Sequence, residues 1–402
     1  MSVLIKNAKI VDYSQTFMGD IYIEEGIIKE IGYSLDKSCE VLEAEGKTLM
    51  PSFVDSHVHF RDPGFTYKED ILSGSRAAVK GGYTAVNLMA NTKPVVSSME
   101  AVEYVLSKAE KYALIDAHQC VSITENFDGE SLEHLDGITS AVRIISEDGK
   151  EVMDSKVMLE AMAKAKKKNI TVMCHCEDHS LSSVDMRLAE NYMTWRNIAL
   201  AEFTGCRLHL AHVSTKEAIG YCIESKRRGS SITFEVTPHH LVLNKEINDY
   251  RVNPPIREEE DRQAIIKAIK EGYVDAIATD HAPHSKEDKE QGAPGLTGLE
   301  TAFSLCYTEL VRGGHITLNR LSELMSKRPA EIVGFKKGRI ALGFHGDLVL
   351  VDLDKEYNIN PEDFYSKGKN TPFKGYKVYG EILKTIKGGR IVYSKESGCS
   401  DN

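Results

Sequence analysis

The sequence predicts an α/β protein: a (β/α)8 barrel of the TIM type, joined to a small β-sandwich domain formed by both chain ends. Three observations carry this prediction. Short strand-like segments with Gly, Asn and Asp turns fill the beginning and the end of the chain. Between them lie eight apolar runs of strand length, and amphipathic helical stretches separate these runs. Strands that alternate with helices are typical of a parallel sheet, and eight such units close a barrel.

The two ends of the chain have the same residue pattern, short alternating segments separated by turn residues. The first fifty residues contain "VLIKNAKIVD", "DIYIEEGIIKEIG" and "CEVLEAEGKTLMP", and the last sixty contain "GDLVLVDLD" and "YKVYGEILKTIKGGRIVY". Alternating apolar and polar residues between turn residues favour antiparallel strands. We therefore expect residues 1–50 and 341–402 to form one discontinuous small domain and residues 51–340 to form the barrel.

The middle segment supplies the eight expected barrel strands in order. They lie in residues 50–60, 83–91, 114–124, 141–149, 170–178, 207–215, 231–240 and 274–284. Helical candidates lie between them, for instance residues 156–168 and 215–229. This order predicts that all eight strands are parallel, with their carboxyl ends on one face of the barrel.

Most of these runs end in a polar residue that is costly to bury without a function. In chain order these residues are His57, His59, Arg61, Asn91, Asp148, His175, His212 and Asp280. Active sites of barrels of this type are built at the carboxyl ends of the strands. We therefore expect four histidines and two aspartates to converge on one place.

His57 and His59 give this convergence a chemical meaning. Residues two apart on a strand project to the same side, ~6.5 Å apart along it. Two imidazoles there can bind one metal ion, and the other strand ends offer further ligands. Imidazole and carboxylate together suit zinc, and manganese, cobalt or iron stay open. Taken singly, His175 is also explained as a hydrogen-bonded core histidine and Asp148 as a turn residue.

Bulk composition narrows the class of protein. The chain has 402 residues, with 42% hydrophobic and 27% charged residues, as in ordinary globular proteins. A formal net charge of −10 and a pI near 5.8 argue against nucleic-acid binding. We expect no signal peptide and no membrane span, because no apolar run reaches ~18 residues. Eight cysteines without tight disulfide spacing predict free thiols in the cytoplasm.

Seven motifs occur in a fixed order over nearly the whole chain: "DSHVHFRDPG", "MANT", "SEDG", "HCED", "AHVST", "RVNPPIR" and "ATDHAPH". Together they resemble the dihydroorotases of the amidohydrolase superfamily. The resemblance implies that His57, His59 and Asp280 bind a first metal ion and that His175 and His212 bind a second.

The bridging position between the two ions departs from many relatives, which use a carboxylated lysine at the end of the fourth strand. "AVRIISEDG" contains no lysine, and Lys150 lies beyond Gly149. Asp148 matches a bridging carboxylate found in one bacterial branch. We therefore expect Asp148 in this position, and one or two Zn²⁺ ions per subunit.

The resemblance also implies a substrate-binding set next to the metal. It consists of His59, Arg61, Asn91, Asn253, His284, Pro294 and Gly295. Arg61, Asn91 and His284 correspond to the residues that bind the substrate carboxylate, and Asn253 to a residue that contacts the substrate ring. The backbone of Pro294 and Gly295 corresponds to a stretch that meets the substrate. Residues 285–294, "SKEDKEQGAP", resemble a mobile loop that folds over the site.

The implied activity is the zinc-dependent, reversible cyclisation of N-carbamoyl-L-aspartate to L-dihydroorotate in pyrimidine biosynthesis. Asp280 would be the catalytic residue, a general base in hydrolysis and a general acid toward the ring nitrogen. Arg61 would set specificity, because a guanidinium matches a carboxylate with two parallel hydrogen bonds.

Two alternatives stay open at this point. One is another cyclic amidase, such as an allantoinase or a dihydropyrimidinase (hydantoinase); Arg61, "MANT" and "VNPP" argue against it. The other is a non-catalytic scaffold for aspartate transcarbamoylase; residues of the right type at all six ligand positions argue against that one. For partners, the resemblance implies the small-molecule substrate and a homodimer, and leaves an association with aspartate transcarbamoylase open.

Overall fold

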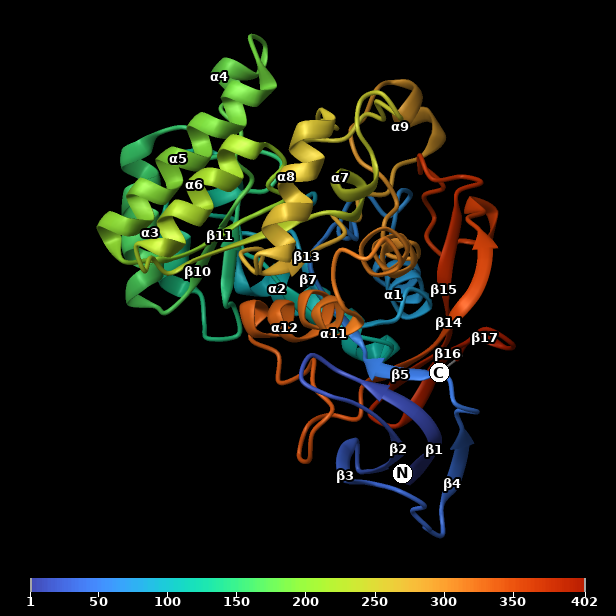
Figure 1. The fold of residues 1–402 in the computed structure, drawn as a ribbon. Helices are drawn as coiled ribbons and strands as arrows, with labels where there is room; N and C mark the ends of the chain where they lie inside the picture. The colour runs from blue at the N-terminus through green and yellow to red at the C-terminus, as the bar shows by residue number, and fades with distance from the viewer. Residues whose placement is uncertain (1, 401–402) are drawn as a thin grey trace.

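The computed structural model describes residues 2–400, and eight parallel strands form a closed barrel in its centre (Figure 1). They are β6 (Phe53–Val58), β7 (Tyr83–Leu88), β8 (Asp116–Gln119), β9 (Ile144–Ser146), β10 (Thr171–Cys174), β11 (Arg207–Leu210), β12 (Ile232–Val236) and β13 (Ala276–Ile277). Hydrogen bonds between neighbouring strands form two sheets, one of β6, β7 and β8 and one of β9 to β13. Parallel bridges Val121–Ile145 and Val58–His281 join them at both seams. The predicted barrel is therefore confirmed.

Helices cover the outside of the barrel. The longer ones are α1 (Ile71–Lys80), α2 (Met99–Tyr112), α3 (Ser155–Lys167), α5 (Met186–Thr204), α6 (Lys216–Arg227) and α8 (Glu259–Lys270). Short helices lie on the loops: α4 (His179–Ser182), α7 (Pro238–Val242), α9 (Lys286–Glu290), η1 (Glu125–Phe127), η2 (Glu133–Gly137) and η5 (Pro361–Asp363). After β13 the chain forms α10 (Ala302–Cys306), η3 (Tyr307–Arg312), α11 (Leu318–Ser322), η4 (Glu323–Lys327) and α12 (Arg328–Val333).

The local sequence explains where these helices begin. Asp70 and Ser73 form a capping box at α1, and Asp154, Asp185 and Thr215 accept backbone N–H groups at the starts of α3, α5 and α6. Such side chains satisfy amides that the first helical turn leaves without partners. The helices expected over 156–168 and 215–229 correspond to α3 and α6.

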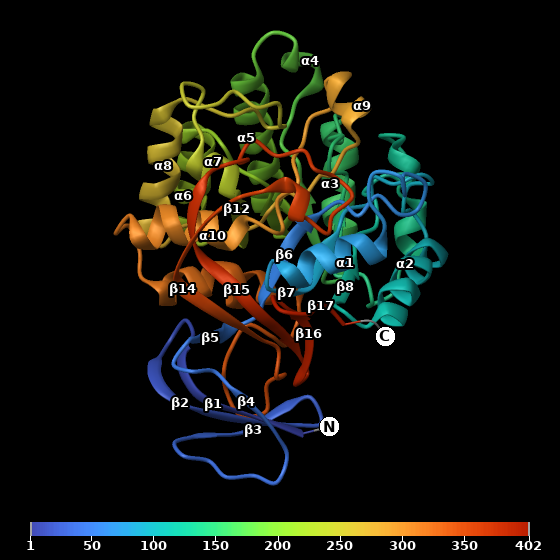
Figure 2. The same cartoon turned by 90° about the vertical axis from the view of Figure 1, so that its right-hand side faces the viewer.

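Both ends of the chain build one nine-stranded sheet below the barrel (Figure 2). Its strands are β1 (Ser2–Val11), β2 (Thr16–Glu24), β3 (Ile27–Gly32), β4 (Glu40–Glu43), β5 (Thr48–Pro51), β14 (Leu348–Asn358), β15 (Lys377–Lys387), β16 (Arg390–Ser394) and β17 (Gly398–Cys399). β5 pairs with both β1 and β14, so the layers of the expected sandwich form one continuous sheet. The division into domains at residues 50 and 341 stays a prediction.

Side chains alternate between two cores along the strands that join these parts. Leu348 and Leu350 of β14 pack in the core of the terminal sheet, together with Ile10, whereas Val349 and Val351 pack in the core of the barrel layer. This is the two-residue period of a strand that is buried on both faces. No helix among residues 2–400 is long and apolar enough to cross a membrane.

Candidate metal centre

The structure brings the six candidate ligands to the carboxyl ends of the barrel strands. His57 lies near the end of β6 and His59 just beyond it, and His175 directly follows β10. Asp148, His212 and Asp280 follow β9, β11 and β13 within three residues. All six side chains are buried. The convergence that the strand rhythm predicts is thus present in the structure.

Asp148 lies at the centre of this cluster. Its Oδ1 is 3.2 Å from His57 Nε2, 3.5 Å from His175 Nδ1 and 3.5 Å from His212 Nε2. Its Oδ2 is 3.3 Å from His59 Nε2. One carboxylate therefore faces four imidazole nitrogens, three at Oδ1 and one at Oδ2.

Asp280 completes a second group of donors with the first histidine pair. Its Oδ1 is 3.2 Å from His59 Nε2 and 3.7 Å from His57 Nε2. Two sets of three donor atoms could each hold a metal ion: His57, His59 and Asp280, and His57, Asp148 and His212. His175 Nδ1 lies 2.9 Å from His212 Nε2, beside the second set.

Each of three histidines contacts a hydrogen-bond acceptor through the ring nitrogen that points away from Asp148, and this contact orients the ring. His57 Nδ1 is 2.9 Å from a Glu235 oxygen, and His59 Nδ1 is 2.8 Å from Asn91 Oδ1. Because these oxygens accept, the two Nδ1 atoms carry a hydrogen, and both Nε2 atoms face Asp148. His175 Nε2 meets Glu177 Oε2 at 3.0 Å, so its Nδ1 faces inward. Acceptors in this position are typical of histidines that bind metals.

Sequence reasoning missed Glu235 and Glu177. Glu235 is fully buried in β12, where it also accepts from His209 Nε2 at 3.0 Å and from the Ser56 hydroxyl. A glutamate inside the apolar run "ITFEV" was an available signal, because a charge there is costly unless it is paired. Glu177 lies in "HCED", and the partner that reveals its role, Asn253, is distant in the sequence.

The electrostatics of the cluster are those of a cation site. Burial lowers the pKa of His175, but Asp148 and Glu177 outweigh it and raise the pKa to about 10. Burial disfavours the charge of Asp148, yet the surrounding histidines hold its pKa well below its usual range. In the metal-free protein these two carboxylates therefore favour the protonated form of His175, and its proton is released when a metal binds.

Two further observations fit a metal. His57 Nε2 and Asp148 Oδ1 are buried without a hydrogen-bond partner among residues 2–400, although they face each other. Arg61, His212 and Asp280 adopt left-handed backbone, with φ of 59°, 34° and 48°. Non-glycine residues rarely do so, and such conformations gather at functional sites.

A cationic group adjoins the cluster on the side of the α9 segment. Arg61 Nη2 is 3.3 Å from His284 Nε2, and Lys68 Nζ is 3.4 Å from His284 Nδ1. Burial first, and then Arg61 and Lys68, lower the pKa of His284 to about 3, so its ring is neutral. A neutral imidazole accepts at one nitrogen only, so only one of the two cations donates to it. Lys68 is also paired with Asp288 at 3.2 Å, which leaves the Arg61 guanidinium without a carboxylate partner among the ion pairs of residues 2–400. Lys68 is the residue of this group that sequence reasoning missed.

The other residues that we expect to bind substrate lie on different sides of the cluster. A Cβ atom at Gly295 would lie 2.8 Å from Ala282 Cβ and 3.4 Å from His284 Nε2, so only glycine fits at this close approach. Pro294, its neighbour, is exposed. Asn253 donates to Glu177 at 2.6 Å and approaches His175 Nε2 at 3.4 Å, on the opposite side of the cluster. Lys150 points away, and its Nζ donates to the Phe127 carbonyl.

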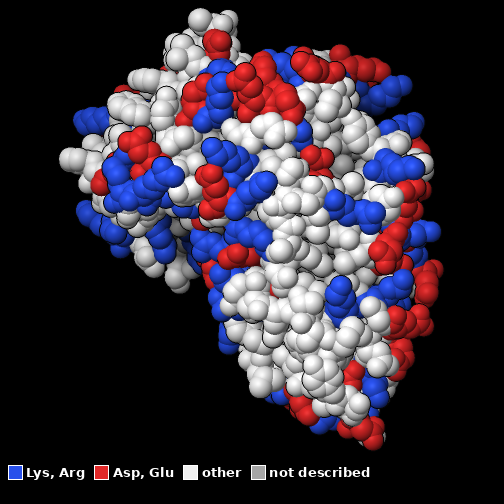
Figure 3. Space-filling view, viewed as in Figure 1, with Lys and Arg blue, Asp and Glu red and all other residues white. Residues whose placement is uncertain are grey.

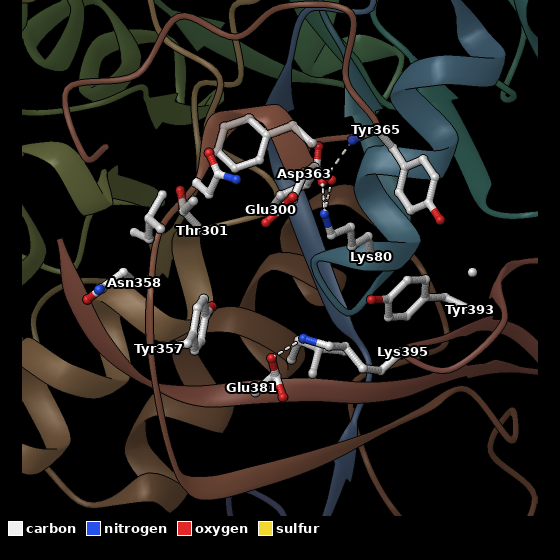
Figure 4. A pocket seen from close by; sticks show the side chains of 15 residues that line it. Lys80, Glu300, Thr301, Tyr357, Asn358, Asp363, Tyr365, Glu381, Tyr393 and Lys395 are labelled. Carbon is white, nitrogen blue, oxygen red and sulfur yellow. Dashed lines mark hydrogen bonds and ion pairs between the residues drawn. The ribbon is translucent and has the colours of Figure 1, made fainter. Parts of the chain in front are cut away.

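A separate cavity of about 370 Å³ lies between α1, the start of α10 and the strands β14 and β15 (Figure 4). Four of its charged groups are already paired: Lys80 with Glu300 at 3.1 Å, and Lys395 with Glu381. It shares no residue with the histidine cluster. We therefore assign it no role in the chemistry.

Comparisons with known proteins give a consistent result. Residues 48–392 match the model of the amidohydrolase family. The dihydroorotase of Clostridium botulinum is 56% identical over 398 residues, which cover 98% of this chain and 100% of that protein. The dihydroorotase of Thermoanaerobacter sp. is 40% identical over 424 residues, which cover 98% of each.

Solved structures resemble the whole chain as well. The dihydropyrimidinase of Brevibacillus agri has a TM-score of 0.88 at 25% identity, with 98% of this chain and 95% of that chain covered. The D-hydantoinase of Thermus sp. has a TM-score of 0.87 at 26% identity, with 99% and 97% covered. The barrel and the terminal sheet are thus shared with cyclic amidases.

Proposed function

Because the chain belongs to the amidohydrolase family and, within it, to the dihydroorotases, we propose that it interconverts N-carbamoyl-L-aspartate and L-dihydroorotate. The observation that carries this assignment is the 56% identity to a dihydroorotase over the full length of both chains. The reaction closes or opens a cyclic amide, so the chain is a hydrolase of C–N bonds. The histidine and aspartate cluster is the site we assign to it.

We propose zinc as the metal, in one or two ions per subunit. His57, His59 and Asp280 would hold the first ion and His175 and His212 the second, with Asp148 between them. Histidine nitrogen and carboxylate oxygen are ordinary zinc ligands, and the unpartnered Asp148 oxygen supports a bridging position. When bound, zinc lowers the pKa of water to roughly 7 and polarises a carbonyl.

Asp280 is the residue we propose to move the proton. Its Oδ1 is held 3.2 Å from His59 Nε2, and the neighbouring histidines outweigh burial and keep its pKa low, so it is ionised and able to accept a proton. In ring opening it takes the proton of the attacking water and passes it to the ring nitrogen as the C–N bond breaks. In ring closure the same carboxylate takes the proton from the carbamoyl nitrogen as the C–N bond forms, and returns it to the departing carboxyl oxygen, which leaves as water.

Substrate recognition falls to the cationic group and its neighbours. The Arg61 guanidinium and His284 would bind the substrate carboxylate, with Asn91 and His59 beside them. Asn253 and the backbone at Pro294 and Gly295 would contact the ring. Hydantoin and dihydrouracil lack this carboxylate, so Arg61 would separate dihydroorotate from the substrates of other cyclic amidases.

The assembly and location of the protein are also proposals. We propose a homodimer, and an association with aspartate transcarbamoylase stays open. Six cysteines are buried as thiols, which supports a reducing location such as the cytoplasm: Cys120, Cys174, Cys176, Cys206, Cys222 and Cys306.

Ring opening of dihydroorotate, followed in the ultraviolet, tests the function. We expect turnover that is lost after chelation and restored by zinc, and weak or no turnover of hydantoin, dihydrouracil and allantoin. Full activity without metal, or a preference for a substrate without the carboxylate, would contradict the proposal. Metal content by elemental analysis, measured on the same samples, separates an inactive scaffold from an enzyme that has lost its metal.

A further inference from the structure

A short segment of the C-terminal part of the chain packs against the substrate side of the candidate site. It comprises residues 366–370, "SKGKN", in the connection between η5 and β15, and we call it the 366–370 segment. Figure 2 shows this connection, in red, rising from the terminal sheet toward α9. The segment contacts two stretches of the loop that follows β13, residues 281–284 and 295–298, which lie on either side of α9 in the sequence.

Asn370 joins these two stretches through its side-chain amide. Its Oδ1 accepts the backbone N–H of His284 at 3.0 Å, and its Nδ2 donates to the Gly295 carbonyl at 3.1 Å. The Thr297 hydroxyl donates to the same Oδ1 at 3.1 Å, and the Thr297 N–H donates to the Asn370 carbonyl at 2.8 Å. Because an amide carries its acceptor and its donor in one plane, this single side chain fixes the spacing of the His284 and Gly295 backbones.

This spacing matters because both residues belong to the set that we expect to bind substrate. The His284 ring lies 3.3 Å from the Arg61 guanidinium, and a Cβ atom at Gly295 would lie 3.4 Å from its Nε2. A shift of either backbone would therefore move the imidazole relative to the guanidinium or close the gap beside it. A misplacement of about 1 Å can cost an enzyme roughly 100-fold.

Gly368 allows the 366–370 segment to approach both stretches closely. A Cβ atom at this position would lie 2.7 Å from Pro283 Cβ and 2.9 Å from Thr297 Oγ1. Such distances are shorter than van der Waals contact, so only glycine fits here. The segment is therefore packed against the two stretches as well as hydrogen-bonded to them.

The other end of the segment reaches the residue beside the proposed proton carrier. Glu69 is fully buried and accepts from the Ser366 hydroxyl and from the Lys367 N–H at 3.3 Å. Its other contact, at 3.3 Å, is to Nε2 of His281, which directly follows Asp280. The 366–370 segment thus contacts the loop after β13 both near Asp280 and at His284.

Hydrogen bonds, and not burial, hold the chain between the two stretches. None of the residues of α9 is buried, and Figure 3 shows side chains of both charges over this helix. Apolar burial is the main stabilising term in most of a folded protein. Where it is missing, the position of the backbone depends on polar contacts such as those of Asn370.

We propose that Asn370 is a positioning residue for substrate binding. Its amide sets the spacing of His284 and Gly295, and so the fit of the site to the carboxylate and the ring of the substrate. A residue that lies outside the barrel strands and their helices thereby completes the barrel's site. The inference rests on the proposed function, which assigns the substrate to His284 and Gly295.

Steady-state kinetics of ring opening test this role. In Asn370→Ala we expect KM for dihydroorotate to rise roughly 10–100-fold. We expect kcat and zinc content to stay close to wild type, because none of the hydrogen bonds of Asn370 among residues 2–400 involves a candidate metal ligand. Asn358→Ala is the matched control and should keep the wild-type KM, since Asn358 is an exposed asparagine at the end of β14.

Asn370→Asp separates the two halves of the contact. It keeps an acceptor for the His284 N–H, but it replaces the donor to the Gly295 carbonyl with a second oxygen, so its KM should rise as well. Melting curves show that each variant is folded. A wild-type KM in Asn370→Ala or in Asn370→Asp overturns the proposal, and so does a loss of kcat or zinc at an unchanged KM.

Hydrogen–deuterium exchange gives a second measurement that needs no turnover. In Asn370→Ala the His284 N–H loses its acceptor, so peptides that cover residues 281–284 should exchange several-fold faster, while peptides of the terminal sheet should match wild type. Unchanged exchange at residues 281–284 overturns the proposal whether or not the protein is active. Wild-type protein that does not open dihydroorotate refutes the function on which the inference rests, and the exchange measurement then still decides whether Asn370 holds the two backbones.

Discussion

Glu235, in β12, contacts two histidines on other strands: His57 of β6 and His209 of β11. It accepts from His57 and His209 through different oxygens, and the Ser56 hydroxyl adds a third contact. Glu235→Gln keeps the shape of the side chain but leaves a single oxygen to accept from all three donors. Because such acceptors fix the tautomer of a ligand, we expect zinc affinity to fall about 10–100-fold.

Elemental analysis after dialysis against graded chelator measures this loss. Glu300→Gln serves as the control, because Glu300 is a largely buried glutamate that lines the separate cavity. Zinc retention equal to that of the wild type in Glu235→Gln would show that His57 does not depend on this acceptor.

Arg61 is the residue whose change should affect binding of the substrate without affecting the metal. Its guanidinium lies 3.3 Å from His284 and does not contact the four candidate histidine ligands. Arg61→Lys keeps the charge but loses the two parallel hydrogen bonds, so KM for dihydroorotate should rise roughly 10–100-fold, a hydrogen bond to a charged group contributing about 1.5–3 kcal/mol. Steady-state kinetics and zinc content are measured on the same sample. Lost zinc with an unchanged KM is the result that rules out this role.

At the scale of elements, one lysine holds the segment of residues 285–295, which contains α9, through hydrogen bonds to backbone carbonyls. Lys289 Nζ donates to the carbonyls of Arg251, Ala293 and Gly295 at 3.1, 2.7 and 3.0 Å. Burial, followed by Arg251, lowers the pKa of Lys289 to about 8, below the ~10.4 of free lysine. As pH rises through about 8, the amine loses a proton and keeps only two hydrogens for three carbonyls.

We therefore expect Lys289→Met to loosen residues 285–295, to raise KM and to increase cleavage of this segment in limited proteolysis. Wild type should approach this behaviour between pH 7 and pH 9, while the variant should change little over that range. Lys286→Met is the control at each pH, because Lys286 is exposed on the same short helix. Equal cleavage of the two variants at pH 7 would show that Lys289 does not hold the segment.

At the scale of the whole molecule, an ionic cluster joins the barrel to the terminal sheet. Lys337 is buried between Asp347, which precedes β14, and Asp116 of β8, which lies 2.6 Å away. Lys387 adds a contact to Asp116 at 2.9 Å. Lys337→Met leaves Asp347 buried without its cation, which costs about 3–5 kcal/mol when a buried pair is broken.

The pH dependence of this stabilisation has a definite sign. Burial opposes the charge of Lys337, but Asp347 and Asp116 raise its pKa overall, so its contribution is present below pH ~10.4 and is lost as pH rises further. Burial also opposes the charge of Asp116, but Lys337 and Lys387 lower its pKa. Its contribution is therefore present above pH ~3.9 and is lost in acid.

The melting temperature of the wild type, measured between pH 3 and pH 11, should be highest between these two pH limits and should fall outside them. The melting temperature of Lys337→Met should be lower and should depend less on pH. Lys336→Met is the matched control, since the neighbouring Lys336 is exposed. A melting temperature of Lys337→Met within one degree of the control would show that the cluster does not hold the two parts together.

The sequence by itself determined the barrel and the membership of the central cluster. The periods of strands and helices depend only on neighbouring residues, so the eight strands and their order can be predicted without knowledge of tertiary contacts. Parallel strands place their carboxyl ends on one face, and this rule alone predicts that His57, His175 and Asp280 meet. The roles of these residues as ligands, and of Arg61 and Asn91 toward substrate, stay predictions.

Only the tertiary structure decided which partners these residues have. Glu235 contacts His57 across 178 residues of sequence, and Lys68 reaches His284 across 216. It also decided which face of α5 is exposed: the helix is apolar on both sides, with Met193 buried and Trp195 outside. Periodicity identifies a face only when the opposite one is polar. Hydrogen bonds act over a few ångströms in space, whereas a sequence records only distance along the chain.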